Sequence, residues 1–277
     1  MRLVDSHGHL NADRFDDDVD LVIGGAKLAG LERILVPGWN HRSSERALEL
    51  VARRPFLDAA VGVHPHDASK LTPAEWRDIE AWARDERVVA IGETGLDLDR
   101  MFSPWEAQLE NLRANLALAL ATGKPAILHC RSRAGERDAQ DALVRELRAA
   151  GFDGAPAREA FGARPPAVIH SFSGPVDYAD EVIAMGLVVS FSGLVFRRGE
   201  EASAEAVQRV PPERLLVETD SPFLSPPGAP RSRNQPEFVA ITARWAAERR
   251  GVGEDGLDAF GDALVAAYDA TFSAVPG

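Results

Sequence analysis

Histidine and carboxylate residues recur along this chain in motifs that suit metal chemistry. His7 and His9 form a His-x-His pair near the start of the sequence, and Asp220 lies far along it. Alternate side chains of an extended segment point to the same face, so both imidazoles can bind one ion. Asp220 would complete a three-ligand site that leaves room for water.

A second group of the same residue types lies in the middle of the chain. His129 and His170 end two successive apolar runs and could hold a second ion, and Glu93 is placed to bridge both. Two divalent ions about 3.5–4 Å apart clamp the attacking and leaving oxygens of a displacement. We therefore predict a hydrolytic centre with two divalent ions. Imidazole and carboxylate ligands suit zinc, manganese, nickel and, less well, magnesium.

Each of these residues alone also has an ordinary structural explanation. A histidine at the end of a strand is usually a satisfied polar residue, and Glu93 or Asp220 could cap a helix. Cys130, beside His129, is more simply a packed neighbour than a nucleophile. The coincidence of six candidates at strand ends is what favours a metal centre.

Eight short apolar runs must position these residues. The runs are continuous rather than alternating, which is typical of strands buried on both faces of a parallel sheet. The predicted strands are residues 2–4, 34–36, 60–63, 88–91, 126–128, 167–169, 187–189 and 215–217. Helix-length segments separate them. Two of these segments begin at predicted capping boxes, Thr72–Glu75 and Ser103–Glu106.

This alternation predicts an α/β fold, a (β/α)8 TIM barrel, with a doubly wound open sheet as the alternative that periodicity does not exclude. Active sites of such barrels lie at the carboxyl ends of the strands, where all six candidates fall. We expect one domain over residues 1–277, with a loop insertion at residues 151–166, which are rich in glycine, alanine and proline.

The composition bears on partners and on the cellular compartment. With 43 acidic and 31 basic residues the net charge is −12, which argues against a broad basic surface that coats duplex nucleic acid. The lone Cys130 predicts a reducing compartment, and no apolar run approaches the roughly 18 residues needed to span a bilayer. The first residues carry no basic and then apolar leader. We expect a cytoplasmic protein that does not associate with a membrane and has no obligate protein partner.

A locally cationic mouth could still hold nucleic acid. Arginines fall in loops after the fourth, fifth, seventh and eighth predicted strands, where they could contact a phosphodiester backbone. A GC-rich genome explains the preference for arginine equally well, since only three basic residues are lysines. The arginines are Arg100, Arg131, Arg133, Arg197, Arg198, Arg231 and Arg233.

Six motifs, in this combination and order, resemble the TatD-like metal-dependent deoxyribonucleases, a branch of the metal-dependent hydrolase superfamily. They extend over nearly the whole chain, and residues 233–236 extend the match further. The motifs are Asp5–Leu10, Gly62–His66, Gly92–Asp97, His129–Arg131, Ile169–Gly174 and Glu218–Pro222.

The resemblance implies a TIM barrel with the ligand set proposed above: His7, His9, Glu93, His129, His170 and Asp220. Asp220 would also be the base that orients or deprotonates water, and Glu93 would bridge. His64 would lie near the scissile phosphate, and Arg100 and Arg131 would contact substrate phosphates. The segment 151–166 is longer than the corresponding segment usually is in the family, and it could narrow or reshape the mouth.

Family members are described as 3′-to-5′ exonucleases on DNA, and some relatives as D-aminoacyl-tRNA deacylases. We expect a two-metal phosphodiesterase that trims single-stranded or frayed DNA from its 3′ end, in DNA repair or degradation. The alternative is a deacylase of aminoacyl-tRNA or a small-molecule amide or ester hydrolase, because the same centre would attack a carbonyl carbon. A binding protein without catalysis is disfavoured, since all six candidate ligands are present.

Overall fold

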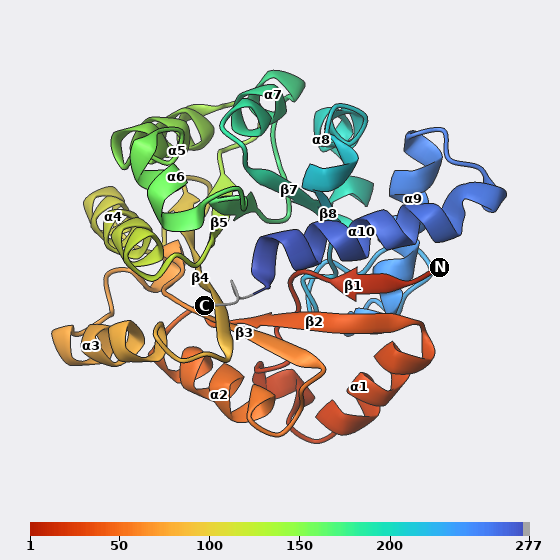
Figure 1. Cartoon of the computed structure of the whole chain (residues 1–277), viewed down its shortest axis with the longest axis horizontal. Coiled ribbons are helices and arrows are strands. Elements are labelled where there is room, and N and C mark those ends of the chain that lie inside the picture. The colour runs from red at the N-terminus through yellow and green to blue at the C-terminus, as the bar shows by residue number, and fades with distance from the viewer. Residues whose placement is uncertain (274–277) are drawn as a thin grey trace.

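The computed structural model describes residues 1–273, and its eight strands form one parallel sheet in chain order (Figure 1). Gly8 and Ser221 form a parallel bridge, and Ser6 N donates to Val217 O at 3.2 Å, which brings the two edge strands together. The predicted (β/α)8 barrel is confirmed. The strands are β1 (Leu3–Asp5), β2 (Leu31–Pro37), β3 (Leu57–Val61), β4 (Val88–Asp97), β5 (Ala126–Arg131), β6 (Ala167–Ile169), β7 (Val188–Phe191) and β8 (Leu215–Val217).

Helices surround this barrel (Figure 1). They are α1 (Val19–Leu28), α2 (His41–Val51), α3 (Pro73–Trp82), α4 (Trp105–Thr122), α5 (Asp138–Ala149), α6 (Ala155–Phe161), α7 (Val176–Ala184), α8 (Glu201–Ala206), α9 (Val239–Arg249) and α10 (Leu257–Phe272). Among residues 1–273, no helix is long and apolar enough to cross a membrane.

One of the two predicted capping boxes forms. Thr72 and Glu75 cap α3 reciprocally, because the Thr72 hydroxyl accepts from Glu75 N and the Glu75 side chain accepts from Thr72 N. The other prediction, at α4, is wrong: Pro104 is the N-cap and makes no side-chain cap. The Ser103 hydroxyl instead donates to His66 O at 3.1 Å, which ties the loop after β4 to the loop after β3.

The interior of the barrel is apolar and closed at one end. Each strand contributes one buried side chain to a single cluster: Val4, Leu35, Ala60, Ala90, Ile127, Val168, Val188 and Leu216. Tyr268 and Phe272 of α10 join this cluster, and the Tyr268 hydroxyl donates to Asp58 in β3 at 2.7 Å. Helix α10 therefore covers the amino ends of the strands, and a functional site can form at their carboxyl ends.

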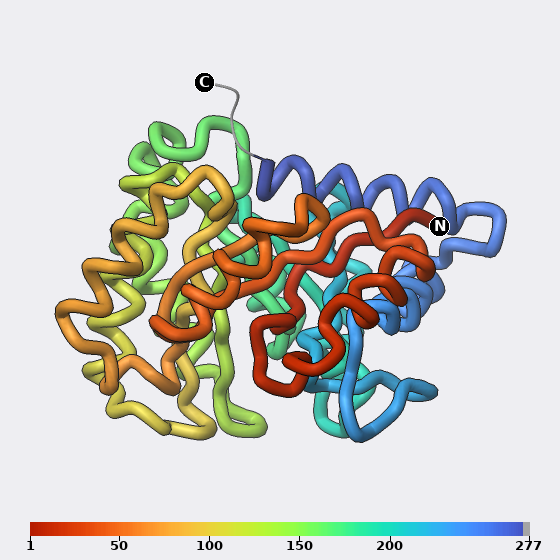
Figure 2. Tube along the Cα trace, turned by 90° about the horizontal axis from the view of Figure 1, so that it is seen from below, coloured from red at the N-terminus to blue at the C-terminus, as the bar shows by residue number. Residues whose placement is uncertain are grey.

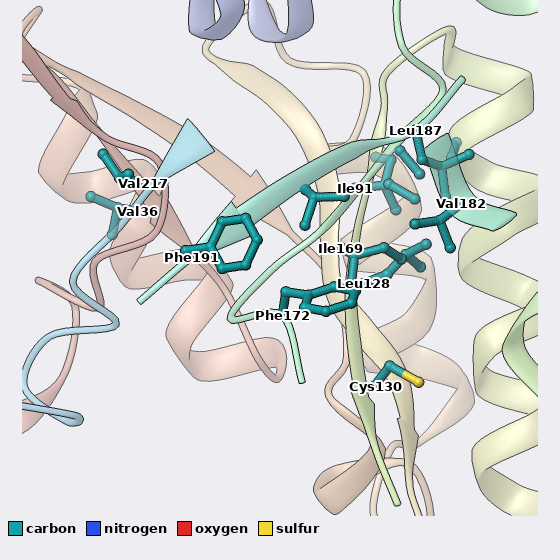
Figure 3. Close-up of a cluster of buried hydrophobic side chains, with 14 of the residues drawn as sticks. Val36, Ile91, Leu128, Cys130, Ile169, Phe172, Val182, Leu187, Phe191 and Val217 are labelled. Carbon is teal, nitrogen blue, oxygen red and sulfur yellow. The ribbon is translucent and has the colours of Figure 1, made fainter. Parts of the chain in front are cut away.

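A second apolar layer lies between the strands and the helices. Figure 3 shows Leu128, Ile169 and Phe191 of three neighbouring strands in one cluster with Val182 of α7. Successive strand residues point alternately into the barrel and toward the helices. Both faces are buried in apolar surroundings, which explains why the strand sequences are continuous apolar runs.

The prediction of a loop at residues 151–166 is wrong in part. Residues Ala155–Phe161 form helix α6, and Phe161 and Phe152 pack together with ring centroids 5.9 Å apart. The segment connects α5 to β6, so it lies at the amino ends of the strands. It therefore does not narrow the mouth.

The mouth lies on the face opposite α10. In Figure 2, α10 runs along the upper side, and the loops after β4, β5 and β8 extend along the lower side. Strands β4 and β5 are longer than predicted and carry their last residues, Asp97 and Arg131, into this face.

Candidate functional site

The first predicted group of ligands assembles where β8 meets β1. The Nε2 atoms of His7 and His9 are 3.2 Å apart, and Asp220 Oδ1 is 3.3 Å from His9 Nε2 and 3.9 Å from His7 Nε2. Asp220 N donates to His7 O at 2.8 Å, so the two loops hold each other. Asp220 has a left-handed φ of 54°, a strained conformation of the kind found at functional sites.

The second group assembles at the ends of β5 and β6. His129 lies within β5 and His170 directly follows β6, because the backbone bond from His170 N to Leu128 O continues the pairing of these strands. His170 Nε2 is 3.4 Å from His129 Nδ1. The imidazoles of His7 and His170 stack with centroids 3.9 Å apart, which joins this group to the first.

Glu93 lies between the two groups and turns one oxygen toward each. Its Oε2 is 3.2 Å from His7 Nε2 and 3.6 Å from His9 Nε2. Its Oε1 is 2.8 Å from His170 Nε2 and 3.3 Å from His129 Nδ1. The carboxylate thus has the position required of a bridge between two ions.

This donor set fits divalent metal. Ring nitrogens converge at nitrogen–nitrogen separations of 3.2 and 3.4 Å, an arrangement in which several lone pairs face one point. Two groups that could hold an ion share Glu93: it combines with His7 and His9 in one, and with His129 and His170 in the other. Neutral imidazole and carboxylate oxygen are ligands that zinc and its neighbours in the first transition series accept.

Glu218 orients one of these histidines, a role that the sequence analysis did not assign. Its Oε1 accepts from His170 Nδ1 at 3.2 Å and from Ser171 N at 2.6 Å, and its Oε2 accepts from Ser190 at 2.6 Å. A proton held on Nδ1 leaves Nε2 of His170 free to bind an ion. The side chain of Glu218 is fully buried, which favours one fixed orientation.

Asp97 orients His129 in the way that Glu218 orients His170. Its Oδ2 accepts from His129 Nε2 at 3.2 Å and from His66 Nε2 at 2.7 Å, which leaves His129 Nδ1 facing Glu93. Gln108 of α4 fixes Asp97 by accepting from its backbone N at 2.8 Å. The sequence carried a signal for this residue, because Glu93 and Asp97 are four apart in one strand and so share a face.

Asp5 holds the loop that carries the His-x-His pair. Its Oδ1 accepts from Thr219 N at 2.9 Å and from His7 N at 3.2 Å, and its Oδ2 accepts from the Thr219 hydroxyl at 2.5 Å. Complete burial raises the pKa of Asp5 to about 7 against these hydrogen bonds. Through these three hydrogen bonds, Asp5 fixes the junction between β1 and β8.

His64 lies beside the cluster as a neutral donor. Its Nδ1 accepts from His66 N at 3.1 Å, so the proton is on Nε2, which donates to Glu93 Oε1 at 3.1 Å. Burial lowers the pKa of His64 to about 4. The imidazole is therefore uncharged at neutral pH, and its one N–H group is donated to Glu93.

The two predicted catalytic carboxylates are ionised. Burial alone would raise the pKa of Asp220, but the hydrogen bond and charge of His9 lower it below its usual value. Burial also opposes ionisation of Glu93, and the facing imidazoles of His170 and His64 nevertheless hold its pKa well below the usual range. Both side chains are therefore negative at neutral pH and can attract cations.

The predicted phosphate-binding arginines share one acidic partner. Arg131 Nε is 3.1 Å and Arg100 Nε is 3.7 Å from Asp99 Oδ2, at the ends of β5 and β4. Arg233 is used elsewhere, in an ion pair with Asp18 at 2.7 Å. The other predicted arginines are exposed and form no ion pair with any residue from 1 to 273: Arg133, Arg197, Arg198 and Arg231.

Cys130 takes no part in the site. Its side chain belongs to the apolar cluster of Figure 3, on the outer face of β5. Burial raises the pKa of its thiol to about 12, so it is protonated at neutral pH and is no nucleophile.

Comparisons with known proteins agree with this geometry. Residues 4–265 match the family described as TatD related DNase. The 3′-5′ ssDNA/RNA exonuclease TatD of Pectobacterium carotovorum is 37% identical over 250 residues, which cover 88% of this chain and 90% of the relative. The uncharacterized metal-dependent hydrolase YabD of Bacillus subtilis is 37% identical over 246 residues. These residues cover 89% of this chain and 90% of the relative.

Solved structures add the same relationship at the level of the fold. The TatD homolog YjjV of Escherichia coli superimposes with a TM-score of 0.85 and 26% identity over 99% of both chains. A phosphotriesterase homology protein of Escherichia coli, at 12% identity and a TM-score of 0.65 over 98% of each chain, shares the fold alone. The family match and the 37% identical relatives confirm the resemblance inferred from the motifs, and the chain belongs to the TatD related DNase family of metal-dependent hydrolases.

Proposed function

We propose that this protein is a two-metal phosphodiesterase that trims single-stranded or frayed DNA from its 3′ end. The observation that carries the proposal is the position of Glu93, whose two oxygens each face one pair of imidazoles. The 37% identical relative named as a 3′-5′ ssDNA/RNA exonuclease supports the substrate and the direction. Such an activity would serve DNA repair or degradation, in the reducing cytoplasm that a protein with one cysteine suits.

Five side chains and the bridging Glu93 would hold the ions. Asp220 and the His-x-His pair surround one position, and the histidines of β5 and β6 surround the other. Bound ions would neutralise charge on the phosphate oxygens and make water more acidic. Zinc, manganese and nickel suit the imidazole-rich donor set best, and magnesium is the fourth candidate.

Asp220 is the proposed base. Its side chain is 14% exposed, whereas that of Glu93 is only 4% exposed, so Asp220 is the more accessible carboxylate for water at the mouth. Its ionised state lets it accept a proton from the attacking water. Glu93, which imidazoles surround on both sides, would contribute by holding the two ions together.

His64 and two arginines are the proposed contacts of the phosphate. The Nε2–H group of His64 donates to Glu93 Oε1 at 3.1 Å, and it can donate instead to an oxygen of the scissile phosphate when Glu93 binds the ions. Arg131 and Arg100 lie at the adjoining rim, 40% and 55% exposed, and can reach neighbouring phosphates by leaving Asp99. Phosphate contacts of this kind position the strand without reading its sequence.

A single substrate panel tests the proposal. Protein loaded separately with zinc, manganese, nickel or magnesium is incubated with 5′-labelled single-stranded DNA, the matching RNA and a D-aminoacyl-tRNA. A ladder of progressively shorter labelled DNA is expected, because removal from the 3′ end keeps the label. Immediate release of a labelled mononucleotide would reverse the direction, and release of the amino acid alone would replace the nuclease with a deacylase. A Glu93→Gln variant purified in parallel controls for contaminating nucleases.

A further inference from the structure

Large apolar side chains are exposed at three places on the described chain. Leu21 and Leu28 lie on the outer helix α1, and Leu28 ends this helix just before β2, on the side of the amino ends of the strands. The remaining exposed residues of this kind are Met101, Phe102 and Phe223, in the loops that follow β4 and β8. Two of the three are aromatic, and both lie next to the proposed metal centre.

Each phenylalanine contacts a histidine of the site. The ring of Phe102, 60% exposed, lies edge-on to His66 with centroids 4.7 Å apart. The ring of Phe223, 52% exposed, lies edge-on to His9 with centroids 6.0 Å apart. His9 belongs to the first ligand group, whereas His66 reaches the second through Asp97.

The two rings belong to opposite sides of the mouth. In an eight-stranded barrel with strands in chain order, β4 and β8 are four strands apart and therefore face each other. Figure 2 shows the loop after β4 (yellow) and the loop after β8 (blue) well separated along the lower face. The cluster of histidines and carboxylates lies between them.

The backbone holds both rings in place. Met101, directly before Phe102, has φ of 50°, and Leu224, directly after Phe223, has φ of 48°. Such conformations are costly for residues other than glycine and persist where the surroundings enforce them, often at functional sites. The buried Asn234 side chain donates to Phe223 O at 2.7 Å, which is part of this enforcement.

The loop after β4 is anchored as firmly. The Ser103 hydroxyl donates to His66 O at 3.1 Å, and the Gln108 side chain donates to Ser103 O at 2.9 Å. A packing role does not explain rings that are more than half exposed on anchored loops. A flat partner that enters from solvent and covers the rings explains both their exposure and the anchoring of their loops.

We propose that Phe102 and Phe223 form a base-stacking pair that receives the nucleobases on either side of the scissile phosphodiester. The inference rests on the proposed nuclease function and adds a subsite for the bases. Aromatic rings stack on every base, so the pair would bind strands of any sequence. Only unpaired bases expose both faces, so the pair would also explain a preference for single strands.

The test separates base contacts from phosphate contacts by changing both partners. Phe102→Ala and Phe223→Ala are assayed on single-stranded DNA and on the same strand with abasic residues at its 3′ end. Stacking on one aromatic ring corresponds to roughly 5- to 160-fold in kcat/KM. We expect each variant to lose this factor on normal DNA, and the wild type to lose it once for each stacked base that the abasic strand lacks. On the abasic strand the variants should match the wild type, because a ring contributes nothing where its partner base is missing.

Three further variants keep the test specific. Phe102→Trp should retain the rate on normal DNA, whereas Phe102→Leu, which stays apolar without a ring face, should lose it. Leu28→Ala removes an even more exposed apolar side chain on α1, 92% exposed, and should change nothing. Metal content and the circular dichroism spectrum should match the wild type in every variant.

Two outcomes would overturn the inference while the nuclease function stands. Either the alanine variants degrade normal DNA at the wild-type rate, or their loss is the same on normal and abasic strands. A wild-type protein that degrades no nucleic acid under any of the four metals would instead remove the proposed function itself, and the subsite with it.

Discussion

Asp220 is the residue at which metal binding and proton transfer can be separated. Asp220→Asn keeps an oxygen that can approach an ion but removes the group that accepts the proton of water. We expect turnover to fall roughly 100- to 10,000-fold while metal content stays near that of the wild type. His7→Asn, which changes only a ligand, should lower metal content as well as rate. Elemental analysis beside single-turnover kinetics decides, and near-normal turnover of Asp220→Asn would place the base elsewhere.

Asp97 and Glu218 show that the ligands themselves need partners. The hydrogen bond from His129 Nε2 to Asp97 fixes which ring nitrogen faces Glu93. Asp97→Asn weakens that preference, because an amide can present either a donor or an acceptor to the ring. We expect metal affinity to fall about 10- to 100-fold, measured by competition with a chromogenic chelator. Unchanged affinity would mean that His129 is oriented by other contacts.

Arg131 tests whether the rim binds phosphate. Its guanidinium pairs with Asp99 at 3.1 Å, and the whole chain carries a net charge of −12, so only a few local contacts can attract a strand. Phosphate contacts release counterions, so kcat/KM should fall with rising salt. Arg131→Ala should flatten this dependence, and Asp99→Asn, which frees the arginine, should raise kcat/KM at low salt. Parallel salt slopes for wild type and Arg131→Ala would exclude the arginine from this role.

At the scale of elements, β4 and β5 approach so closely that the site depends on a glycine. Gly95 pairs with His129 in register, has φ of 140°, and a Cβ there would lie 1.9 Å from His129 O. Gly95→Ala should therefore destabilise the fold by about 3 kcal/mol or more and displace His129. Gly186→Ala is the matched control, because its φ is 82° and its Cβ would meet open space, so it should cost only about 1 kcal/mol.

Chemical denaturation of the two glycine variants measures the difference. Equal losses of unfolding free energy would show that β4 and β5 can separate slightly at no cost. A larger loss for Gly95→Ala together with reduced metal content would link the close approach of the strands to the geometry of the centre.

At the scale of the whole molecule, stability and site occupy opposite ends of the barrel. The interior cluster and α10 close the amino ends of the strands, whereas the six proposed ligands lie at the carboxyl ends. Removal of metal should therefore abolish hydrolysis while the circular dichroism spectrum is retained. The melting temperature should fall, because an ion that binds only the folded state stabilises it. Full activity of a sample verified as metal-free would exclude the metal mechanism.

The sequence alone predicted the barrel, beside a doubly wound sheet that periodicity did not exclude, and it predicted the residues that meet at the mouth. Continuous apolar runs such as 167–169 and 215–217 predicted buried parallel strands, and β6 and β8 have these same bounds. Because parallel strands of a barrel all end on one face, a residue that follows a strand must lie at that face, whatever its distance along the chain. Histidines and carboxylates after five different strands could therefore be placed together without coordinates.

Local pairings were decided only by the tertiary structure. The Ser103 hydroxyl bonds to the loop after β3 rather than capping α4, and residues 155–161 form a helix on the far side from the mouth. Asp5 bonds to Thr219 and Glu218 to His170, contacts that depend on how the barrel closes and on which face of each strand end a side chain occupies. Strand periodicity specifies a face but not a partner, since partners come from register and loop geometry. Register and loop geometry also decide that Glu93 turns one oxygen toward each pair of imidazoles. They likewise leave Phe102 and Phe223 exposed on either side of it.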